Sequence, residues 1–257
     1  MRTPILAYHK VQPGFEPGFT AITPAKFAKQ IEYLADSGYH TISFSSLVSG
    51  DFKNHSRQVI LTFDDALECV YDFAFPILKR FSFTATIFVV TKYVGGRNIW
   101  DYHVGPFRSR HCSWAQLLRL YDAGWEIGSH TVSHPSLNSL TLSRGWHELR
   151  YSRDLLEKKL GSPVRVVSYP FGKHTTEIVK LSRRAGYEAA CTLGRNINCA
   201  QTDPYRLARR GVYAFEPLWL FKHKVRNSWI SRLDDLKQVA ITFLAQGTLL
   251  LRYFRGR

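Results

Sequence analysis

Several signatures that would assign this chain to a common class of protein are missing from its sequence. It has no zinc-finger spacing, no aromatic signature of an RNA-binding sheet and no Gly-rich phosphate loop. Its four cysteines, at positions 69, 112, 191 and 199, form no C-x-x-C pair, which favours reduced thiols. Acidic residues are scarce, with 20 Asp and Glu against 35 Lys and Arg and a net charge of +15. This charge favours anionic surfaces such as acidic lipid, and without a recognition motif we expect no nucleic-acid partner.

Long apolar runs are missing too. The chain has no run of roughly 18 or more apolar residues, which argues against a membrane-spanning helix. The apolar stretch after Met1-Arg2-Thr3 is too short for the core of a secretory signal. We therefore expect a cytoplasmic protein, at most peripheral on the inner face of the membrane. The hydrophobic fraction of 45% and the aromatic fraction of 14% are nevertheless sufficient for a packed core.

Short β-prone runs alternate with helical patterns along most of the chain. Helix boundaries are marked by signals such as the Thr23-Pro24 start and the Gly38 stop, and a long helix is expected at 142–160. We expect strands near residues 5–8, 39–43, 59–63, 84–90, 125–129, 164–168 and 187–192. This alternation predicts parallel strands with crossover helices, arranged as a barrel or as a doubly wound sheet.

The predicted strand at 59–63 leads directly into two adjacent carboxylates, Asp64 and Asp65. An ionised carboxylate in apolar surroundings is costly unless a partner shares its charge, so the pair indicates a site at the strand end. The alternative is that both residues cap the following helix and complement its dipole. Consecutive strand residues face opposite sides, so the two carboxylates should have different roles.

Histidines follow two other predicted strands. His9 comes after the first strand, and His130 and His134 come after the strand at 125–129. Two imidazoles four residues apart lie on one side of a helical turn, and with a carboxylate they form a common ligand set for a catalytic divalent metal. The alternative is a capped, partly exposed turn. Because the carboxyl ends of parallel strands converge on one face, we expect these residues and Tyr169–Phe171 to lie together.

Three motifs occur in a characteristic order: Thr-Phe-Asp-Asp at 62–65, His-Thr-x-x-His-Pro at 130–135 and Ser-Tyr-Pro-Phe-Gly at 168–172. The ordered set resembles the polysaccharide deacetylase family (NodB-homology domain, carbohydrate esterase family 4) over about residues 4–215. Tyr8-His9 and Trp100-Asp101 resemble its exopolysaccharide branch. The resemblance implies an α/β fold, a distorted (β/α) barrel with about seven parallel strands. It also implies a metal-dependent hydrolase that removes acetyl groups from N-acetylated sugars of a polysaccharide or a lipid-linked glycan.

The resemblance further implies roles for individual residues. Asp64 matches the general base, and Asp65, His130 and His134 match the ligands of a divalent metal, which is zinc in most members. His9 matches a histidine that acts as general acid in the exopolysaccharide branch, although it could instead be a strand-end hydrogen bonder. Substrate contacts are expected from the third motif and from the long loop after the strand at 84–90. The residues concerned are Tyr169, Pro170, Phe171, Gly172, Trp100 and Asp101. For Tyr169 and Trp100 the alternative is an ordinary place in the core.

The sequence departs from the family pattern in three places. Ala66 follows Asp65 where Gly is frequent, and Ser168 stands where an Arg usually steadies the catalytic Asp. The C-terminal Leu-x-His motif is not evident. Arg209 or Arg210 is a candidate replacement for the missing Arg, from a neighbouring strand end. These departures leave two alternatives open: a metal hydrolase of another amide or of an O-acetyl ester, and an inactive carbohydrate-binding barrel.

The last part of the chain is strongly basic. We expect a barrel domain at 1–215 and a basic, partly amphipathic helical extension at 216–257. From residue 204 onward there are 11 Lys and Arg against three acidic residues. The apolar stretch Val239–Leu251 is too short to span a bilayer but suits an interfacial helix. The extension is therefore expected to contact an anionic membrane and bring the barrel to a lipid-linked glycan, or else to pack on the barrel as an ordinary helix.

Overall fold

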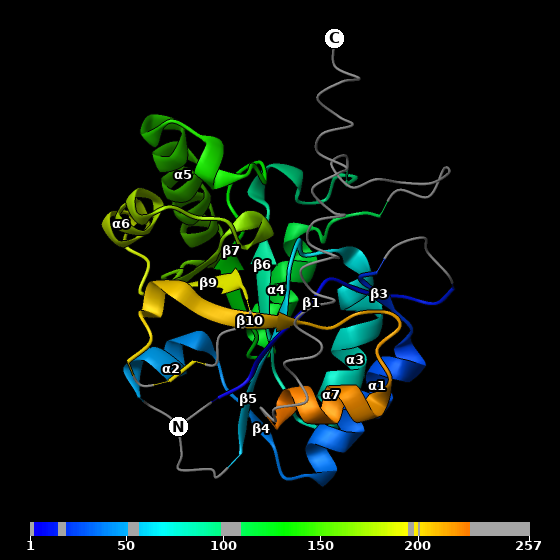
Figure 1. Ribbon diagram of the computed structural model, residues 1–257. Coiled ribbons are helices and arrows are strands. Elements are labelled where there is room, and N and C mark those ends of the chain that lie inside the picture. Colours follow the sequence, from blue (N-terminus) through cyan, green and yellow to red (C-terminus); the bar gives the residue numbers. More distant parts are fainter. Residues whose placement is uncertain are drawn as a thin grey trace.

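A ring of parallel strands closes around the centre of the molecule (Figure 1). The computed structural model describes residues 3–14, 19–50, 57–98, 109–194, 198–199 and 201–226. The strands follow the order β1-β10-β9-β8-β7-β6-β5, and pairing of β1 with β5 closes the ring. They are β1 (Ile5–Tyr8), β5 (Gln58–Phe63), β6 (Thr86–Val89), β7 (Glu126–Ser129), β8 (Val166–Ser168), β9 (Ala189–Leu193) and β10 (Leu207–Gly211). The predicted parallel barrel is confirmed, and β10 is a strand that the sequence patterns did not reveal.

Three shorter strands lie beside the ring. β4 (His40–Thr41) pairs with the start of β5, and the Oγ1 of Thr41 accepts a hydrogen bond from the N–H of Thr84, 2.9 Å away. β4 therefore lies between the amino ends of β5 and β6, and it is shorter than the predicted strand at 39–43. β2 (Lys10–Val11) and β3 (Ala21–Ile22) form a separate parallel pair next to the carboxyl end of β1.

Helices surround the ring, and their ends follow the sequence signals. The Oγ1 of Thr23 accepts the N–H of Lys26, and Pro24 occupies the first turn of α1. The predicted helix at 142–160 is confirmed, and it ends at Gly161, which has a φ of 66°. The helices are α1 (Pro24–Asp36), α2 (Phe44–Ser49), η1 (Val70–Ala74), α3 (Phe75–Arg80), η2 (Thr91–Tyr93), α4 (Trp114–Asp122), η3 (Leu137–Ser139), α5 (Leu142–Leu160), η4 (Pro170–Gly172), α6 (Thr176–Ala185), η5 (Pro204–Arg206) and α7 (Leu218–Val225).

Alternation along the strands decides which side chains fill the barrel and which pack under the helices. Ile60 of β5 is buried in a cluster with Ile5 of β1 and other strand residues. Its neighbour Leu61 belongs to the larger cluster that includes helix residues such as Leu149. The same alternation turns Asp64, just beyond the end of β5, toward the barrel interior. Its interior position brings this carboxylate to the residues described below.

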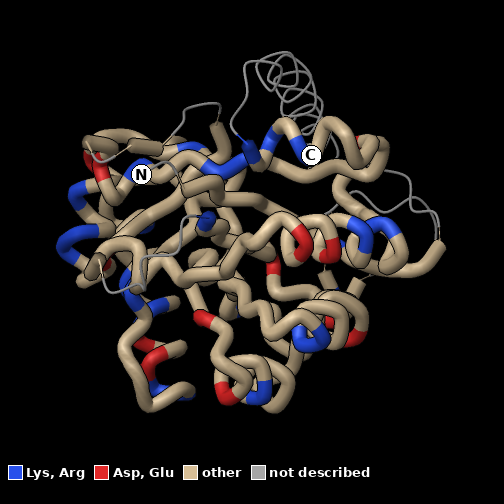
Figure 2. Tube along the Cα trace, turned by 90° about the horizontal axis from the view of Figure 1, so that it is seen from below, with Lys and Arg blue, Asp and Glu red and all other residues tan. Residues whose placement is uncertain are grey.

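Helix α7 is the described part of the predicted extension, and it packs on the barrel. Phe221 and Val225 are fully buried, and the Nζ of Lys224 donates to Glu216 (2.5 Å) and to the carbonyl of Gly211 (2.6 Å). The stretch Val239–Leu251 lies outside the described residues. No helix within the described ranges is long and apolar enough to cross a membrane. Lys and Arg positions occur on every side of the barrel, interspersed with Asp and Glu (Figure 2).

Candidate active site

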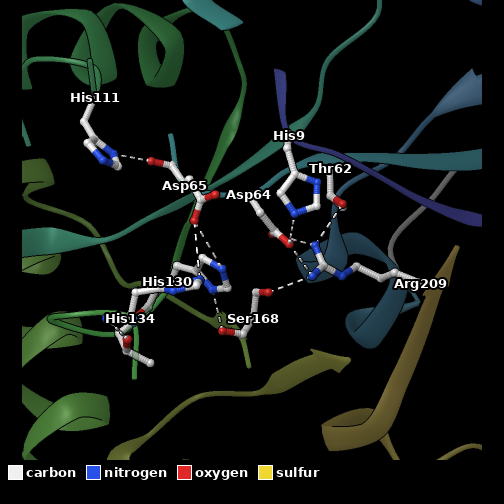
Figure 3. Close-up of polar contacts among 11 residues, drawn as sticks. His9, Thr62, Asp64, Asp65, His111, His130, His134, Ser168 and Arg209 are labelled. Atoms are coloured by element: carbon white, nitrogen blue, oxygen red, sulfur yellow. Dashed lines mark hydrogen bonds and ion pairs between the residues drawn. The ribbon is translucent and has the colours of Figure 1, made fainter. Parts of the chain in front are cut away.

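Polar side chains from five strands meet at the carboxyl ends of the barrel strands (Figure 3). The predicted convergence of the three histidines and the two aspartates on one face is therefore found in the structure. They form two halves, one around Asp64 in the barrel interior and one around Asp65 beside it. The residues are His9 after β1, Asp64 and Asp65 after β5, His130 and His134 after β7, Ser168 at the end of β8 and Arg209 within β10.

Arg209 holds Asp64 in a bidentate ion pair. Its Nη1 lies 2.7 Å from Oδ1 of Asp64 and its Nη2 lies 2.8 Å from Oδ2. The guanidinium is completely buried, lies over the ring of Phe88 and donates a further hydrogen bond to Thr62 Oγ1 at 3.0 Å. Two parallel charge-assisted bonds fix the plane of the carboxylate as well as its position. Arg209 thus supplies the cation that the third motif lacks.

Ser168 explains how an arginine from β10 can reach this place. Its small side chain leaves room at the end of β8, and its Oγ accepts a hydrogen bond of 2.7 Å from Arg209 Nη2. Its carbonyl accepts a hydrogen bond of 2.8 Å from Nδ1 of His130. Ser168 therefore contacts both halves of the site.

Opposing effects set the charge of Asp64. Burial would raise the pKa of this carboxyl, but the charge and hydrogen bonds of Arg209, together with the neighbouring His130 and His9, more than offset burial and bring the pKa well below its usual range. Asp64 is therefore ionised at neutral pH. The imidazole of His9 faces it, with Nε2 4.0 Å from Oδ2, and the His9 side chain is 24% exposed. His9 is open enough to meet a ligand, whereas Asp64 is almost completely buried.

Asp65, His130 and His134 form a compact set of metal-ligating atoms, one from each residue, all within 4.8 Å of one another. Nε2 of His130 is 3.7 Å and Nε2 of His134 is 3.5 Å from Oδ1 of Asp65. These separations are long for direct hydrogen bonds. Two ligands of a tetrahedral zinc, each about 2.0–2.1 Å from the ion, lie about 3.4 Å apart, so the spacing fits a shared divalent ion.

The protonation of the two imidazoles also fits a cation. Burial lowers the pKa of His130 to about 4, and burial together with the neighbouring His130 lowers the pKa of His134 well below its usual value. Both rings are therefore neutral at neutral pH. Because Nδ1 of His130 donates to the Ser168 carbonyl, its Nε2 carries the lone pair that faces Asp65. One carboxylate with two neutral imidazoles is a ligand set of zinc.

Strained backbone is concentrated at this site. Asp65 (φ 68°), Ala66 (φ 49°), Thr131 (φ 69°), His134 (φ 61°) and Phe171 (φ 58°) are non-glycine residues in the left-handed region. Such a conformation costs on the order of 1–3 kcal/mol per residue, and it persists only where surrounding contacts enforce it. In the family that the chain resembles, glycine is frequent at this position and adopts a positive φ without this cost, whereas Ala66 carries it. Clustered strain of this kind indicates a functional site.

Glu148 of α5 supports the loop between the two histidines. Its Oε2 accepts the N–H groups of Val132 (2.8 Å) and Ser133 (2.9 Å), and its Oε1 accepts the Ser133 hydroxyl at 2.6 Å. The N–H of His134 donates to Thr131 Oγ1 at 3.1 Å within the same loop. Glu148 therefore counters the strain at Thr131 and His134, and it stabilises the loop from behind.

Glu148→Gln should weaken this support, because an amide oxygen cannot replace both carboxylate oxygens. We expect the affinity for zinc to fall about 10- to 100-fold and the free energy of unfolding to fall by about 1–3 kcal/mol. Zinc competition titration and urea denaturation measure these two quantities. Glu157→Gln is the matched control on the same helix, because Glu157 accepts from Val164 N–H and pairs with Arg153 at the other end of α5. It should lower stability without changing zinc affinity.

Comparison with known proteins places the chain in a family. The polysaccharide deacetylase family model matches residues 52–190. The chain belongs to the polysaccharide deacetylase family. It is similar to YxkH of Bacillus subtilis, at 28% identity over 231 residues, 88% of this chain and 72% of YxkH. It is also similar to the poly-beta-1,6-N-acetyl-D-glucosamine N-deacetylase of Staphylococcus epidermidis, at 27% identity over 211 residues, 77% of this chain and 71% of that protein.

Solved structures of deacetylases share the fold. The Streptococcus pyogenes deacetylase PplD, solved with acetate, superimposes with a TM-score of 0.76 at 23% identity, over 88% of this chain and 98% of PplD. IcaB from Ammonifex degensii superimposes with a TM-score of 0.71 at 25% identity, over 82% of this chain and 91% of IcaB. The likeness extends over nearly the whole barrel, so this polysaccharide deacetylase has the barrel of its relatives.

The predicted substrate contacts of the third motif need correction at Tyr169 and Pro170. Tyr169 is fully buried, donates its hydroxyl to Ser182 Oγ of α6 at 3.3 Å and stacks on His174, so its side chain belongs to the core. Pro170 is buried as well. Phe171 is partly exposed, and its ring centroid is 4.8 Å from that of His134, which keeps it at the mouth beside Gly172. Tyr169 turns away because it precedes a sharp turn, in which Phe171 takes up a positive φ.

Two further predicted contacts of the deacetylase, Trp100 and Asp101, lie outside the described residues. Sequence reasoning named Arg209 only as one of two candidates and overlooked Glu148 and His111. Glu148 gave a usable signal, since its helical spacing places it on the same face as Leu149 and Leu156. His111 gave none, because its contact with the backbone of Asp65 joins segments that are distant in sequence.

Proposed function

We propose that this polysaccharide deacetylase is a metal-dependent hydrolase that removes acetyl groups from N-acetylated sugars of a polysaccharide or a lipid-linked glycan. The observation that carries the proposal is the division of two adjacent carboxylates between different partners. Asp64 is held by Arg209, and Asp65 faces two neutral imidazoles. A hydrolase that couples a base to a metal needs this division, whereas a pair of helix caps does not. The curated relatives named for N-deacetylation of poly-beta-1,6-N-acetyl-D-glucosamine support the substrate class.

Asp65, His130 and His134 would hold the ion, with zinc as the expected metal. A divalent ion bound there would polarise the acetyl carbonyl and acidify a nucleophilic water. Asp64 accepts the proton of the attacking nucleophile. Because its pKa is lowered, it is a weak base that suits only an acidified nucleophile. This requirement explains why the base and the ligand are neighbours in the chain.

His9 is the proposed general acid. Its imidazole faces Asp64 from the end of the adjacent strand β1 and is partly exposed, so it can donate a proton to the departing sugar amine. The N–H of Phe171, in the strained turn beside His134, is the proposed donor to the oxyanion that forms at the acetyl carbon. Phe171 and Gly172, and Trp100 and Asp101 outside the described residues, are the proposed substrate contacts.

Metal removal tests the proposal. Zinc-loaded protein should release acetate from β-1,6-linked N-acetylglucosamine oligomers, and treatment with a chelator should reduce the rate more than about 100-fold, with recovery on adding zinc. Acetate release and bound zinc are measured in the same samples. Faster release from an O-acetylated glycan would favour ester hydrolysis. Protein that takes up zinc but releases acetate from neither substrate would favour a carbohydrate-binding barrel. Wild-type protein that takes up no divalent ion would contradict every metal-hydrolase interpretation.

The basic extension is proposed as a membrane contact. We propose that residues 216–257 follow a barrel domain at 1–215 and rest on an anionic membrane, with α7 fixing the start of the extension to α1 and β10. Removing residues after about 230 should lower binding to vesicles that contain anionic lipid. Unchanged binding to those vesicles would contradict this proposal without affecting the deacetylase.

A further inference from the structure

We propose that His111 is a positioning residue, which holds the carboxylate of Asp65 at the metal site through a hydrogen bond to the Asp65 backbone. The inference rests on the proposed metal centre. His111 contacts the backbone of Asp65 from a different side than the two ligand histidines, which face its carboxylate (Figure 3). His111 lies 46 positions after Asp65 in the sequence and belongs to none of the three motifs at 62–65, 130–135 and 168–172.

The contact itself is short and buried. Nδ1 of His111 lies 2.6 Å from the carbonyl oxygen of Asp65, and the His111 residue is only 2% exposed. A carbonyl oxygen can only accept, so Nδ1 carries the proton and donates it. The His111 ring also stacks on Tyr93, with a centroid distance of 5.9 Å and an interplanar angle of 27°. Ring stacking and a fixed donor together leave the imidazole little freedom.

The neighbouring backbone of His111 reinforces this contact. Residues 110–112 run antiparallel to residues 66–68, with a bridge between Leu67 and His111. The N–H of Cys112 donates to the carbonyl of Ala66 at 2.7 Å, and the N–H of Glu68 donates to the carbonyl of Arg110 at 2.8 Å. The carbonyls of both left-handed residues, Asp65 and Ala66, therefore receive hydrogen bonds from one short segment.

Energetics make this support necessary. Two consecutive left-handed residues are strained, and the strain persists only where surrounding contacts enforce it. A buried carbonyl that loses its hydrogen bond adds a desolvation cost. With the His111 donor present, the strained turn at Asp65 and Ala66 has a lower free energy than a relaxed turn that lacks this hydrogen bond. Without it, relaxation of the turn would rotate the Asp65 side chain away from His130 and His134. His111 thus acts on the metal through Asp65, without contacting the metal site itself.

The donor position allows a sharp test with two amide variants. In His111→Asn the side-chain amide nitrogen takes the place of Nδ1, whereas in His111→Gln it takes the place of Nε2 and cannot reach the carbonyl in the same way. We expect zinc affinity within about threefold of wild type for His111→Asn and at least about tenfold weaker for His111→Gln. Zinc affinity comes from competition titration with a chromogenic chelator, and unfolding temperatures of the metal-free proteins are measured alongside.

Cys112→Ala is the matched control. It removes the Cys112 Sγ contact with the carbonyl of Leu67, 3.4 Å away in the same bridge, without touching Asp65. This variant should lower the unfolding temperature but keep wild-type zinc affinity. Weakened zinc binding in Cys112→Ala, matching that of His111→Gln, would overturn the proposal in favour of a general packing role.

Other zinc affinities of the two His111 variants also test the proposal. Zinc affinity in His111→Gln equal to that of wild type, or an equal loss in His111→Asn and His111→Gln, would overturn the role of the donor. If His111→Gln does not fold, His111→Asn alone decides, since a loss above tenfold contradicts the proposal and a change within threefold supports it. Wild-type protein that binds no zinc would instead contradict the proposed function, so the two failures are distinguishable.

Discussion

Asp64→Asn should reduce the rate of acetate release by about 10²- to 10⁴-fold, the range expected when a general base is lost. The amide keeps the size of the side chain but cannot take a proton from the nucleophile. Bound zinc should persist, because Asp65, His130 and His134 are unchanged. Acetate release and zinc content of the same preparation measure the two effects. An active Asp64→Asn protein would assign the base elsewhere.

Stability must be followed in the same variant. Asn at 64 leaves the buried Arg209 guanidinium without its counter-charge, and breaking a buried ion pair from one side costs about 3–5 kcal/mol. Activity should therefore be compared at a temperature where the folded fraction of each protein is known from its denaturation curve. Loss of activity in folded protein then reports on chemistry alone.

Arg209→Met should lower the free energy of unfolding by about 3–5 kcal/mol, because Asp64 would remain buried without its bidentate partner. The rate of acetate release should also fall, since the carboxylate is no longer held in position. Urea denaturation measures the first effect and acetate release by the folded protein measures the second. Stability close to wild type would show that the ion pair is not the principal partner of Asp64.

Arg210→Met is the matched control for Arg209→Met. Arg210 is the next residue of β10, is almost as buried, and donates to the carbonyl of Lys224 outside the site. Its loss should destabilise the protein with little effect on the folded enzyme. The double variant Asp64→Asn, Arg209→Met should be less destabilised than the two single effects combined, with a coupling of more than about 1 kcal/mol. Additive losses would contradict direct pairing.

Much of the fold was predictable from local patterns. The start of α1 at Pro24 and the ends of α5 at Leu142 and Leu160 follow from capping residues and apolar spacing, which act within a few positions of the chain. β10 was missed because its sequence, Leu207–Gly211, carries two arginines and reads as a polar loop. One of them, Arg209, is completely buried and forms an ion pair with a carboxylate that lies 145 positions earlier. No local pattern contains such a partner.

The predicted substrate contacts of the third motif were also only partly predictable from local sequence. The Tyr-Pro-Phe sequence predicted aromatic side chains at the mouth, and Phe171 is there. Tyr169 is not, because the space beneath α6 and the hydroxyl of Ser182 accept it in the core. Which of two aromatic residues faces the ligand depends on the turn at Phe171 and on the packing of α6, and neither can be inferred from residue type.

The sequence by itself determined the two neighbouring carboxylates after a buried strand, the spaced histidines, and the parallel alternation that brings strand ends together. These features depend on periodicity and on the order of residues along the chain. Only the tertiary structure decided that Arg209 steadies Asp64, that Ser168 makes room for it, and that His111 meets the backbone of Asp65. Those contacts join residues far apart in sequence, and they exist only because closure of the barrel brings β10 beside β1 and the segment at 110–112 beside the end of β5.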